Sequence, residues 1–479
     1  MTDTLMVGVS GIRGIVGKDL TEETVARYAR AFGTWARGST QRPVVVVGRD
    51  ARESGPAFER AVIDALVSVG CAVVQVGVVP TPTVQLAVEH HHAAGGIAIT
   101  ASHNPIEWNA LKFIGPDGIF LDGADGKRVL SLAQQDDGKA RTVGKGGGSV
   151  QRDPGAVERH LEAVLKLPAV DIAGIRERRF TVALDAVRGA GGPVMRALLE
   201  RLGCRVPGIN LETDGRFPRP PEPVPENLGE LTGLVRRSGA DVGIAVDPDV
   251  DRLAIVDEQG VPIGEDYTLA FAVRAVLGVG QSDSRTVGLK SAGLSDCPTV
   301  RPSVVCNLST SLVVEDAARE CGAEVVRTPV GEVHVARAIL RLAAVIGGEG
   351  NGGVMYPALH AGRDAPVAAA LLLTLLARTG TRVSGLVAAA PRYAIEKTKL
   401  ERGTRNAERG MDAIYAALRG RFPDAMADTQ DGLRLAWRDR WLHVRPSNTE
   451  PIIRLIAEAP ARADAEQLIE EGRRLCAAS

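Results

Sequence analysis

The sequence predicts an α/β protein made of three related α/β domains with mixed sheets, followed by an α+β domain with an open antiparallel sheet. At 479 residues, the chain is too long for a single hydrophobic core. One strand–turn–helix–strand pattern occurs three times, at domain-sized intervals. The pattern then changes after Thr379. These observations place the four domains at residues 1–150, 151–258, 259–380 and 381–479.

Each repeat consists of a strand, a polar turn, an amphipathic helix, a glycine and a second strand. The first strands are short, continuous apolar runs, which are typical of a parallel sheet that is covered on both faces. The first repeat predicts strands at 44–47 and 73–76, the second at 181–185 and 204–206, and the third at 303–307 and 323–326. The intervening helices are expected to end near residues 70, 202 and 321.

Two segments between the repeats are predicted to be irregular. Residues 136–154 are polar and rich in glycine, which indicates a loop or a domain junction. Residues 216–225 carry five prolines and cannot form regular structure. Beyond Thr379, we expect strands at 393–398, 432–437 and 441–445 and a helix near 409–418, which together indicate a smaller α+β domain.

The composition is that of an ordinary globular protein, with 45% hydrophobic and 24% charged residues. A net charge of −1 argues against a general nucleic-acid or membrane binder. Six cysteines without Cys-x-x-Cys spacing predict buried free thiols rather than disulfides or zinc ligands. The N-terminus does not resemble a signal peptide, and the longest apolar stretch, 366–377, is shorter than the roughly 20 residues that span a bilayer. We therefore expect a cytoplasmic protein.

A candidate nucleophile lies in residues 100–105, which read Thr-Ala-Ser-His-Asn-Pro and follow the apolar run 96–99. The Asn-Pro pair ends the strand in a sharp turn. The turn holds the hydroxyl of Ser102 where backbone N–H groups could receive an anion. The alternative is a surface turn with a capping serine.

A candidate metal site follows the predicted strand 242–246. Asp247, Asp249 and Asp251 alternate along one loop and can converge on a divalent cation, and their hard oxygen ligands favour Mg²⁺. The spacing argues against an EF-hand, because the expected glycine follows late and no glutamate occupies the closing position of that loop. The alternative is a solvated acidic turn.

Two glycine-rich segments suggest contacts with a ligand. Residues 347–353 contain Glu349 and Asn351, which could bind sugar hydroxyls, although a flexible connector is the alternative. This segment lacks the ending of a Walker A loop. Residues 10–17 suggest a tight loop that brings Arg13 close to an anion, or else a plain turn with an exposed arginine.

A candidate phosphate-binding turn spans residues 445–451 and is followed by a second arginine. Arginine side chains, hydroxyls and turn N–H groups suit a phosphate. A surface Arg–Glu pair is the alternative. The candidate ligands of the phosphate are Arg445, Ser447, Asn448, Thr449 and Arg454.

Taken in order, these motifs resemble the alpha-D-phosphohexomutase family over essentially the whole chain. The resemblance implies four domains around a central cleft, and a Ser102 that is phosphorylated in the active enzyme. It also implies one Mg²⁺ per chain, held by Asp247, Asp249, Asp251 and the phosphorylated Ser102. The last domain would grip the phosphate that is not transferred.

The resemblance further implies a two-step phosphoryl exchange through a sugar bisphosphate. Arg13 and Arg252 would stabilise charge on the moving group. Lys112 matches the family's lysine after the serine loop and is the candidate general acid/base. His103 is a further catalytic candidate beside the serine.

Two motifs depart from the family pattern. The family's sugar loop usually reads Glu-x-Ser-Gly-His, whereas this chain has Gly353 in place of the histidine. A glycine that is common in the phosphate turn is replaced by Asn448. The sugar loop and residues 330–333 resemble the archaeal-type phosphoglucosamine mutase-like branch.

The sequence thus predicts a phosphohexomutase that interconverts hexose or hexosamine 6-phosphate and 1-phosphate, with glucosamine phosphate as the first choice. The alternative is a phosphoglucomutase/phosphomannomutase. More remote alternatives are a metal-dependent phosphatase and a non-catalytic sugar-phosphate sensor. The expected partner is a small sugar phosphate, with no nucleic acid and no membrane, and the chain is expected to be a monomer or a homodimer.

Overall fold

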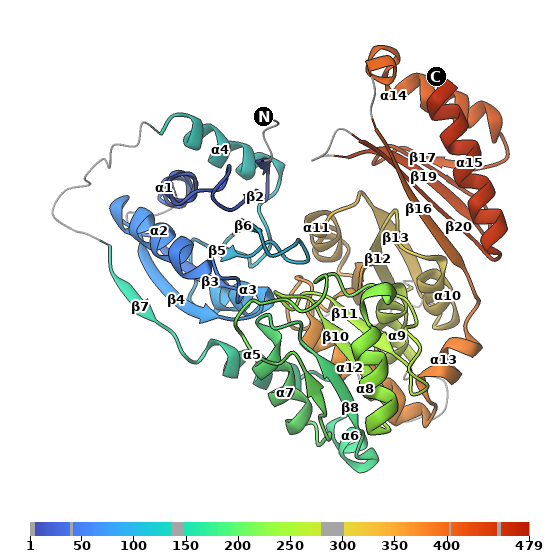
Figure 1. The fold of residues 1–479 in the computed structure, drawn as a ribbon, viewed down its shortest axis with the longest axis horizontal. Coiled ribbons are helices and arrows are strands. Elements are labelled where there is room, and N and C mark those ends of the chain that lie inside the picture. The colour runs from blue at the N-terminus through green and yellow to red at the C-terminus, as the bar shows by residue number, and fades with distance from the viewer. Residues whose placement is uncertain are drawn as a thin grey trace.

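The computed structural model describes residues 5–38, 42–136, 148–278, 301–401, 404–447 and 452–478. Its strands form four sheets, of seven, four, four and five strands. Figure 1 shows the four units along an arc: the first lies at the left, the second and third lie below and to the right of it, and the fourth stands at the upper right. This arrangement agrees with the predicted fold class.

The first sheet is mixed. β3 (Val44–Arg49) runs parallel to β4 (Ala72–Val78) and β5 (Gly95–Ile99), whereas β6 (Trp108–Ile114) runs antiparallel to β5. The strand order is β1-β2-β6-β5-β3-β4-β7. The remaining elements of this unit are β1 (Met6–Gly8), β2 (Gly11–Ile15), β7 (Val150–Arg152), α1 (Glu22–Ala36), α2 (Gly55–Ser68), α3 (Thr81–His90) and α4 (Gly123–Gln134).

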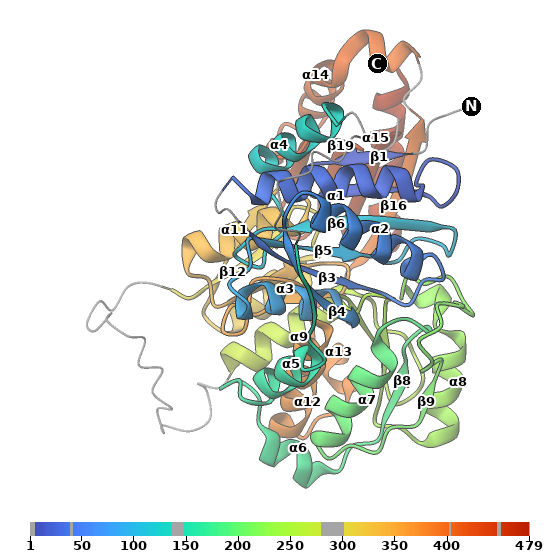
Figure 2. The same cartoon turned by 90° about the vertical axis from the view of Figure 1, so that its left-hand side faces the viewer.

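Helices cover both faces of this sheet, which explains why its central strands are apolar throughout. One core cluster joins Val45 and Val47 of β3 to α1, α2 and α4. A second cluster joins Val46, on the opposite face, to Val84 and Val88 of α3. Figure 2, in which this unit faces the viewer, shows α1 and α2 lying alongside β5 and β6.

The second and third sheets repeat one plan. In the order β11-β10-β8-β9, strand β10 is parallel to β8 and antiparallel to β11. In the order β13-β12-β14-β15, strand β14 is parallel to β12 and antiparallel to β15. The strands are β8 (Val182–Asp185), β9 (Gly208–Ile209), β10 (Val242–Val246), β11 (Leu253–Val256), β12 (Ser303–Asn307), β13 (Glu324–Thr328), β14 (Ile346–Glu349) and β15 (Gly353–Met355).

The helices of these two units enclose a shared hydrophobic core that runs from Leu161 to Ala390. At its centre lies α12, whose N-cap Asp364 accepts a hydrogen bond from the backbone N–H of Val367 at 3.0 Å. The helices are α5 (Ala156–Leu165), α6 (Ile172–Arg178), α7 (Gly191–Arg201), η1 (Pro225–Asn227), α8 (Gly229–Ser238), α9 (Asp266–Leu277), α10 (Leu312–Glu320), α11 (Glu332–Leu342), α12 (Ala365–Thr379) and α13 (Val383–Ala389).

The fourth sheet is fully antiparallel, in the order β16-β20-β19-β18-β17. Its helices are α14 (Thr404–Arg421), which is interrupted at Gly410, and α15 (Arg462–Ala478). The alternating burial along β20 matches a sheet with one covered face. The strands are β16 (Ala394–Glu401), β17 (Met426–Asp428), β18 (Leu433–Ala436), β19 (Trp441–Pro446) and β20 (Ile452–Ala459).

The apolar stretch predicted at 366–377 lies inside α12 and is buried. Within the described ranges, no single helix is long and apolar enough to cross a membrane. The pair α12 and α13 reaches that length only when counted together, and the two helices meet at 82°.

Several local predictions were wrong. The junction expected at 136–154 contains β7, which pairs with β4, and residues 137–147 of it lie outside the described part. The strand expected at 204–206 is reduced to a bridge between Thr181 and Arg205, and β9 forms further along. The tight loop expected around Arg13 is strand β2. Cys71, Cys204, Cys306, Cys321 and Cys476 are free, as predicted, and Cys297 lies outside the described residues.

Candidate active site

Three equivalent turns of the repeated units form the candidate site. In each of the first three sheets, a strand with a parallel neighbour is followed by an antiparallel strand: β5 and β6, β10 and β11, and β14 and β15. The turn after β5 carries Ser102, the turn after β10 carries the three aspartates, and β14 ends at Glu349. The repeat seen in the sequence therefore brings the three motifs to corresponding places in the fold.

A cavity of about 390 Å³ lies where these turns meet. The predicted residues Arg13, Ser102, His103, Lys112, Arg252, Glu349 and Asn351 all line it. The first three units supply its lining, and the fourth contributes none of its described residues. The geometry thus collects the predicted catalytic and sugar-contacting side chains around one space.

Ser102 is buried and reaches the aspartate loop. Its hydroxyl donates a hydrogen bond to Oδ2 of Asp247 at 2.8 Å and lies 3.4 Å from Nδ1 of His103. Its φ of 49° places it in the left-handed region, which costs a residue other than glycine about 1–3 kcal/mol. The surrounding structure must therefore hold this turn firmly.

The side chain of Arg52, a residue that the sequence analysis did not single out, supports the serine turn. Its guanidinium is buried and donates to the carbonyl oxygens of Ser102 and Asn104 at 2.6 and 2.7 Å. It also donates to the carbonyl oxygens of Pro105 and Trp108 at 2.7 and 2.8 Å. One side chain thus contacts four backbone acceptors of the sharp turn, of which the carbonyl oxygen of Pro105 also accepts from the backbone N–H of Trp108 at 3.1 Å.

Asp50 completes this support. It pairs with Nε of Arg52 at 3.1 Å and accepts a hydrogen bond from Thr100 Oγ1 at 2.7 Å. Thr100 Oγ1 in turn accepts from the backbone N–H of Ser102 at 2.9 Å. Burial raises the pKa of Asp50, and the positive charge of Arg52 opposes that rise. The signal for this network was the polar turn that follows the apolar strand at 44–47.

The three aspartates form a pocket that fits a divalent cation. One carboxylate oxygen of each lies within 4.8 Å of the others, and all three side chains are buried. Oδ1 of Asp249 and Oδ1 of Asp251 are buried without a hydrogen-bond partner. Between them, Val250 has a φ of 62°, which is rare for a β-branched residue. Converging carboxylate oxygens are the ligands that Mg²⁺ prefers.

The charges of this cluster are coupled. Burial and the neighbouring Asp251 and Asp249 raise the pKa of Asp247 well above its usual range. Burial also acts to raise the pKa of Asp249, but Lys112 and Thr81 outweigh it and lower that pKa. Lys112 Nζ lies 2.7 Å from Asp249 Oδ2 and 3.4 Å from Asp251 Oδ2. A cation at this point would relieve the repulsion among the carboxylates.

A positive surface flanks Ser102. Arg13 donates to Oδ1 of Asn104 in the serine turn at 2.6 Å, and burial together with Arg252 lowers the pKa of Arg13. Arg252 lies 3.4 Å from Glu222. The charge of Arg252, burial and the charge of Arg13 all lower the pKa of His103. These groups are suited to an anion such as a phosphoryl group.

The predicted sugar loop is a hairpin rather than a free loop. Gly347 and Gly348 lie inside β14, and the turn occupies residues 350–352. Glu349 is buried, and Oε1 accepts from Asn307 at 2.9 Å and from the backbone N–H of Gly331 at 3.2 Å. Asn351 donates to Oε2 of Glu349 at 3.4 Å.

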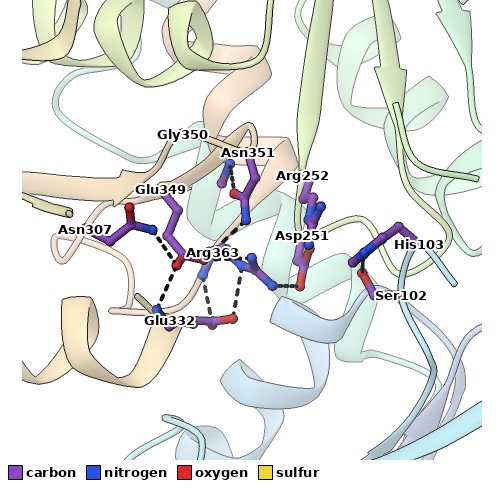
Figure 3. A network of polar contacts seen from close by, with 12 residues as sticks. Ser102, His103, Asp251, Arg252, Asn307, Glu332, Glu349, Gly350, Asn351 and Arg363 are labelled. Atoms are coloured by element: carbon purple, nitrogen blue, oxygen red, sulfur yellow. Dashed lines mark hydrogen bonds and ion pairs between the residues drawn. The ribbon is translucent and has the colours of Figure 1, made fainter. Parts of the chain in front are cut away.

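Two further side chains, which sequence reasoning did not single out, complete this end of the cavity. Arg363 contacts Glu349 and Glu332 on one side and Asp251 on the other (Figure 3). The sequence analysis included Glu332 only as a member of residues 330–333, which resemble one branch of the family. The signal for Arg363 was an Arg-Asp pair immediately before the long apolar stretch.

The predicted phosphate turn lies in the fourth unit. Arg445 and Arg454 are directly opposite one another in the β19–β20 pair. Like charges at such positions repel, so an anion between them would be favourable. Arg445 lies 3.4 Å from Asp431, and burial lowers its pKa. Ser447 follows β19, whereas Asn448 and Thr449 lie outside the described residues.

Four family profiles match the chain in order. They are described as phosphoglucomutase/phosphomannomutase alpha/beta/alpha domain I (residues 4–139), domain II (158–260), domain III (289–393) and C-terminal domain (399–475). Together they cover most of the sequence. The exact domain boundaries predicted from the sequence stay predictions.

Similar proteins match along their full lengths. A "Phosphoglucomutase/phosphomannomutase" of Thermococcus kodakarensis is 38% identical over 476 residues, with 98% of each chain covered. A "Probable phosphoglucosamine mutase" of Methanopyrus kandleri is 37% identical, covering 97% of this chain and 96% of the relative. A crystal structure of a phosphoglucomutase/phosphomannomutase family protein from Burkholderia thailandensis is 27% identical with a TM-score of 0.80, covering 99% of this chain and 98% of that one.

Proposed function

The chain belongs to the phosphoglucomutase/phosphomannomutase family of alpha-D-phosphohexomutases, and from that premise we propose that it works through a phosphorylated Ser102. The protein is a phosphohexomutase, an isomerase that moves a phosphoryl group within a hexose phosphate. The single observation that carries the assignment of Ser102, which lines the cavity, is its hydrogen bond to the buried Asp247. A hydroxyl held against a metal-binding loop is suited to carry a phosphoryl group.

In the proposed first step, phospho-Ser102 gives its phosphoryl group to the free hydroxyl of a sugar monophosphate. The P–Oγ bond breaks, and a new P–O bond to the sugar oxygen forms, which yields a bisphosphate. The proton of the sugar hydroxyl ends on Oγ of Ser102, the leaving oxygen. Lys112, the candidate general acid/base, lines the cavity beside the aspartates, whose charges outweigh burial and raise its pKa, so it would give a proton to Oγ before it takes one from the sugar. After the bisphosphate turns over, its other phosphoryl group returns to Ser102.

Arg13, Arg252 and His103 would surround the group in transfer. All three line the cavity together with Ser102. Two guanidinium groups in a buried site stabilise the charge of a moving phosphoryl group more strongly than they would in water. His103, whose pKa is lowered, would act as a neutral hydrogen-bonding group beside the serine.

Asp247, Asp249, Asp251 and an oxygen on Ser102 would hold one Mg²⁺. The convergence of the three carboxylates supports this assignment, as do the Oδ1 atoms of Asp249 and Asp251, which are buried without a hydrogen bond. When bound, the ion would supply positive charge to the phosphoryl oxygens. Arg445, Ser447, Asn448, Thr449 and Arg454 would anchor the second phosphate from the fourth unit.

For the sugar, we propose glucosamine phosphate, with glucose and mannose phosphates as the alternative. Glu349 and Asn351 would contact hydroxyls in the middle of the ring, which must bind in two orientations. The names of the relatives are divided between phosphoglucosamine mutase and phosphoglucomutase/phosphomannomutase. A carboxylate near a 2-amino group would favour a glucosammonium ion. The small-molecule substrate, a cytoplasmic location and a monomeric or homodimeric state complete the proposal.

Replacing Ser102 by alanine tests the phosphoserine. We expect turnover to fall nearly to zero, while binding of the sugar phosphate remains measurable by calorimetry. Intact mass spectrometry should detect a phosphate adduct in the wild type that is absent from Ser102→Ala. The control is Ser68→Ala on α2, whose hydroxyl only donates to a helix carbonyl. Wild-type turnover in Ser102→Ala would remove this serine from the mechanism.

A further inference from the structure

The side chain of Arg363 occupies the space in front of Gly353. A Cβ atom at position 353 would lie 2.2 Å from Cδ of Arg363 and 2.9 Å from its Cγ. Gly353 is not among the glycines with a positive φ, so its backbone would accept a side chain. The arginine, rather than backbone geometry, therefore demands glycine here. Gly353 is also the partner of Glu349 in the β14–β15 pair.

The guanidinium of Arg363 contacts three carboxylates from three different elements. Nη2 donates to Asp251 Oδ2 at 2.6 Å, Nη1 donates to Glu349 Oε2 at 2.9 Å, and Nε lies 3.0 Å from Glu332 Oε2 (Figure 3). All four side chains are buried. Burial acts to lower the pKa of Arg363, but Asp251, Glu332 and Glu349 outweigh it and raise that pKa well above its usual range.

These contacts determine which oxygens of Asp251 and Glu349 are occupied by protein donors. At Asp251, Arg363 and Lys112 contact Oδ2, and Oδ1 has no hydrogen-bond partner and lies 3.9 Å from Nε of Arg252. At Glu349, Arg363 and Asn351 contact Oε2, and Asn307 and Gly331 contact Oε1. The same guanidinium thus fixes the orientation of one carboxylate in the metal loop and one in the sugar loop.

We propose that Arg363 is a positioning residue that couples the sugar loop to the metal loop through Asp251 and Glu349. It acts on the reaction through these two carboxylates. The proposal rests on the roles assigned above to Glu349 and to the aspartates. It implies that damage to Arg363 weakens sugar-phosphate binding and metal binding together, although only one side chain has changed.

The first test replaces Arg363 by lysine, which keeps the positive charge and loses the planar fork. Two equilibrium measurements on the purified full chain are needed: Mn²⁺ binding followed by electron paramagnetic resonance, and glucose 6-phosphate binding followed by calorimetry. We expect both dissociation constants to rise by about tenfold or more, because each lost hydrogen bond joined charged groups. The matched control is Arg274→Lys. Arg274 lies on α9, forms an ion pair with Glu320 at 2.6 Å and is not in the cavity lining.

The second test is a double-mutant cycle between Gly353→Ala and Arg363→Ala. Gly353→Ala alone should weaken the binding of both Mn²⁺ and glucose 6-phosphate and should lower the thermal unfolding midpoint. The reason is that the new methyl group would collide with Cδ of Arg363, whose side chain is held in place by its ion pairs. In the Arg363→Ala background, the same change should have little further effect. Thermal unfolding is read for all four proteins, so that loss of folding is separated from loss of binding.

An Arg363→Lys protein that binds both ligands as the wild type does would overturn the proposal. So would a change in only one of the two affinities, or an equal effect of Gly353→Ala in both backgrounds. These measurements require no turnover. If wild-type protein carried no phosphate on Ser102, the proposed function would fail on that result, while the coupling would still be decided by the two affinities.

Discussion

Ser102 and Asp247 are hydrogen-bonded at 2.8 Å although they are 145 positions apart in the chain. Each lies in the turn that follows a buried strand of its own sheet, β5 in the first unit and β10 in the second. The contact therefore joins two copies of one structural repeat.

Asp249→Asn should weaken metal binding and reduce kcat. The substitution removes a negative charge while keeping the size of the side chain. The ion's charge is needed most in the transition state, so kcat should fall more than KM rises. Chelation of the wild type should abolish turnover, and added Mg²⁺ should restore it. Calorimetric titration with Mn²⁺ gives the affinity directly.

The control for this prediction is Asp257→Asn. Asp257 is also a buried carboxylate of the second unit, but it accepts hydrogen bonds from the backbone N–H groups of Gln259 and Val261. Its replacement should leave metal affinity unchanged. Full activity of metal-free wild type in excess chelator would contradict the metal assignment.

Arg52→Lys should lower kcat by about a hundredfold, because a small displacement of a reacting group has effects of this size. A lysine ammonium cannot reach the four carbonyl oxygens that Arg52 contacts in the serine turn. Glucose 6-phosphate binding should be retained, since Arg52 is not in the cavity lining. Steady-state kinetics and calorimetry separate the two effects.

Arg49→Lys provides the comparison for Arg52. Arg49 belongs to the same strand end, but it pairs with Glu59 at 3.1 Å instead of the serine turn. We expect it to alter stability without a large change in kcat. Equal losses of kcat in the two variants would show that the serine turn does not depend on Arg52 in particular.

The sequence predicted the strands that have continuous apolar runs, such as β3 and β12, because burial on both faces leaves an unbroken signal. It missed β7, all of whose residues are exposed at the sheet edge. It also read Gly347 and Gly348 as loop residues. Side chains there would meet the carbonyl oxygens of Val305 and Gly353 at 2.5 and 2.2 Å, so these glycines allow close packing inside a strand.

Within the site, the motifs that could be read are those whose members are close together in the sequence. Asp247, Asp249 and Asp251 lie on one loop, and their alternating spacing in the sequence predicts that they come together. Arg363 could not be found in this way, since its partner Asp251 is 112 positions distant. Arg52 contacts backbone carbonyls, which every residue has, so its partners leave no trace in the sequence.

Arg445→Ala should raise KM for the sugar phosphate by roughly ten- to a hundredfold, because a hydrogen bond to a charged group contributes about 1.5–3 kcal/mol. An anchored phosphate is bound equally in the ground state and in the transition state, so kcat should change less. Steady-state kinetics measure both constants. Arg440→Ala, beside Trp437 at the end of the same sheet, is the control. A loss of kcat with KM unchanged would contradict the anchor.

The last prediction concerns which sugar the enzyme prefers. Glu349 is a carboxylate in the cavity lining, and four protein donors already surround it: Asn307, Gly331, Asn351 and Arg363. A carboxylate has about four lone-pair sites, so a sugar group must displace one donor. The longest of these contacts, at 3.4 Å, is that of Asn351. An ammonium group gains more from this exchange than a hydroxyl does, because it brings a full charge to the carboxylate.

We therefore expect kcat/KM to be highest for glucosamine 1-phosphate among the 1-phosphates of glucosamine, glucose and mannose. Asn351→Ala should narrow this preference less than Glu349→Gln does, since the second change removes the charge that selects the ammonium group. Comparing kcat/KM for the three substrates in the wild type and both variants measures the effect as a ratio, which cancels general losses of activity. A glucosamine value below those of both glucose and mannose would reverse the assignment of the sugar and leave the mutase reaction itself intact.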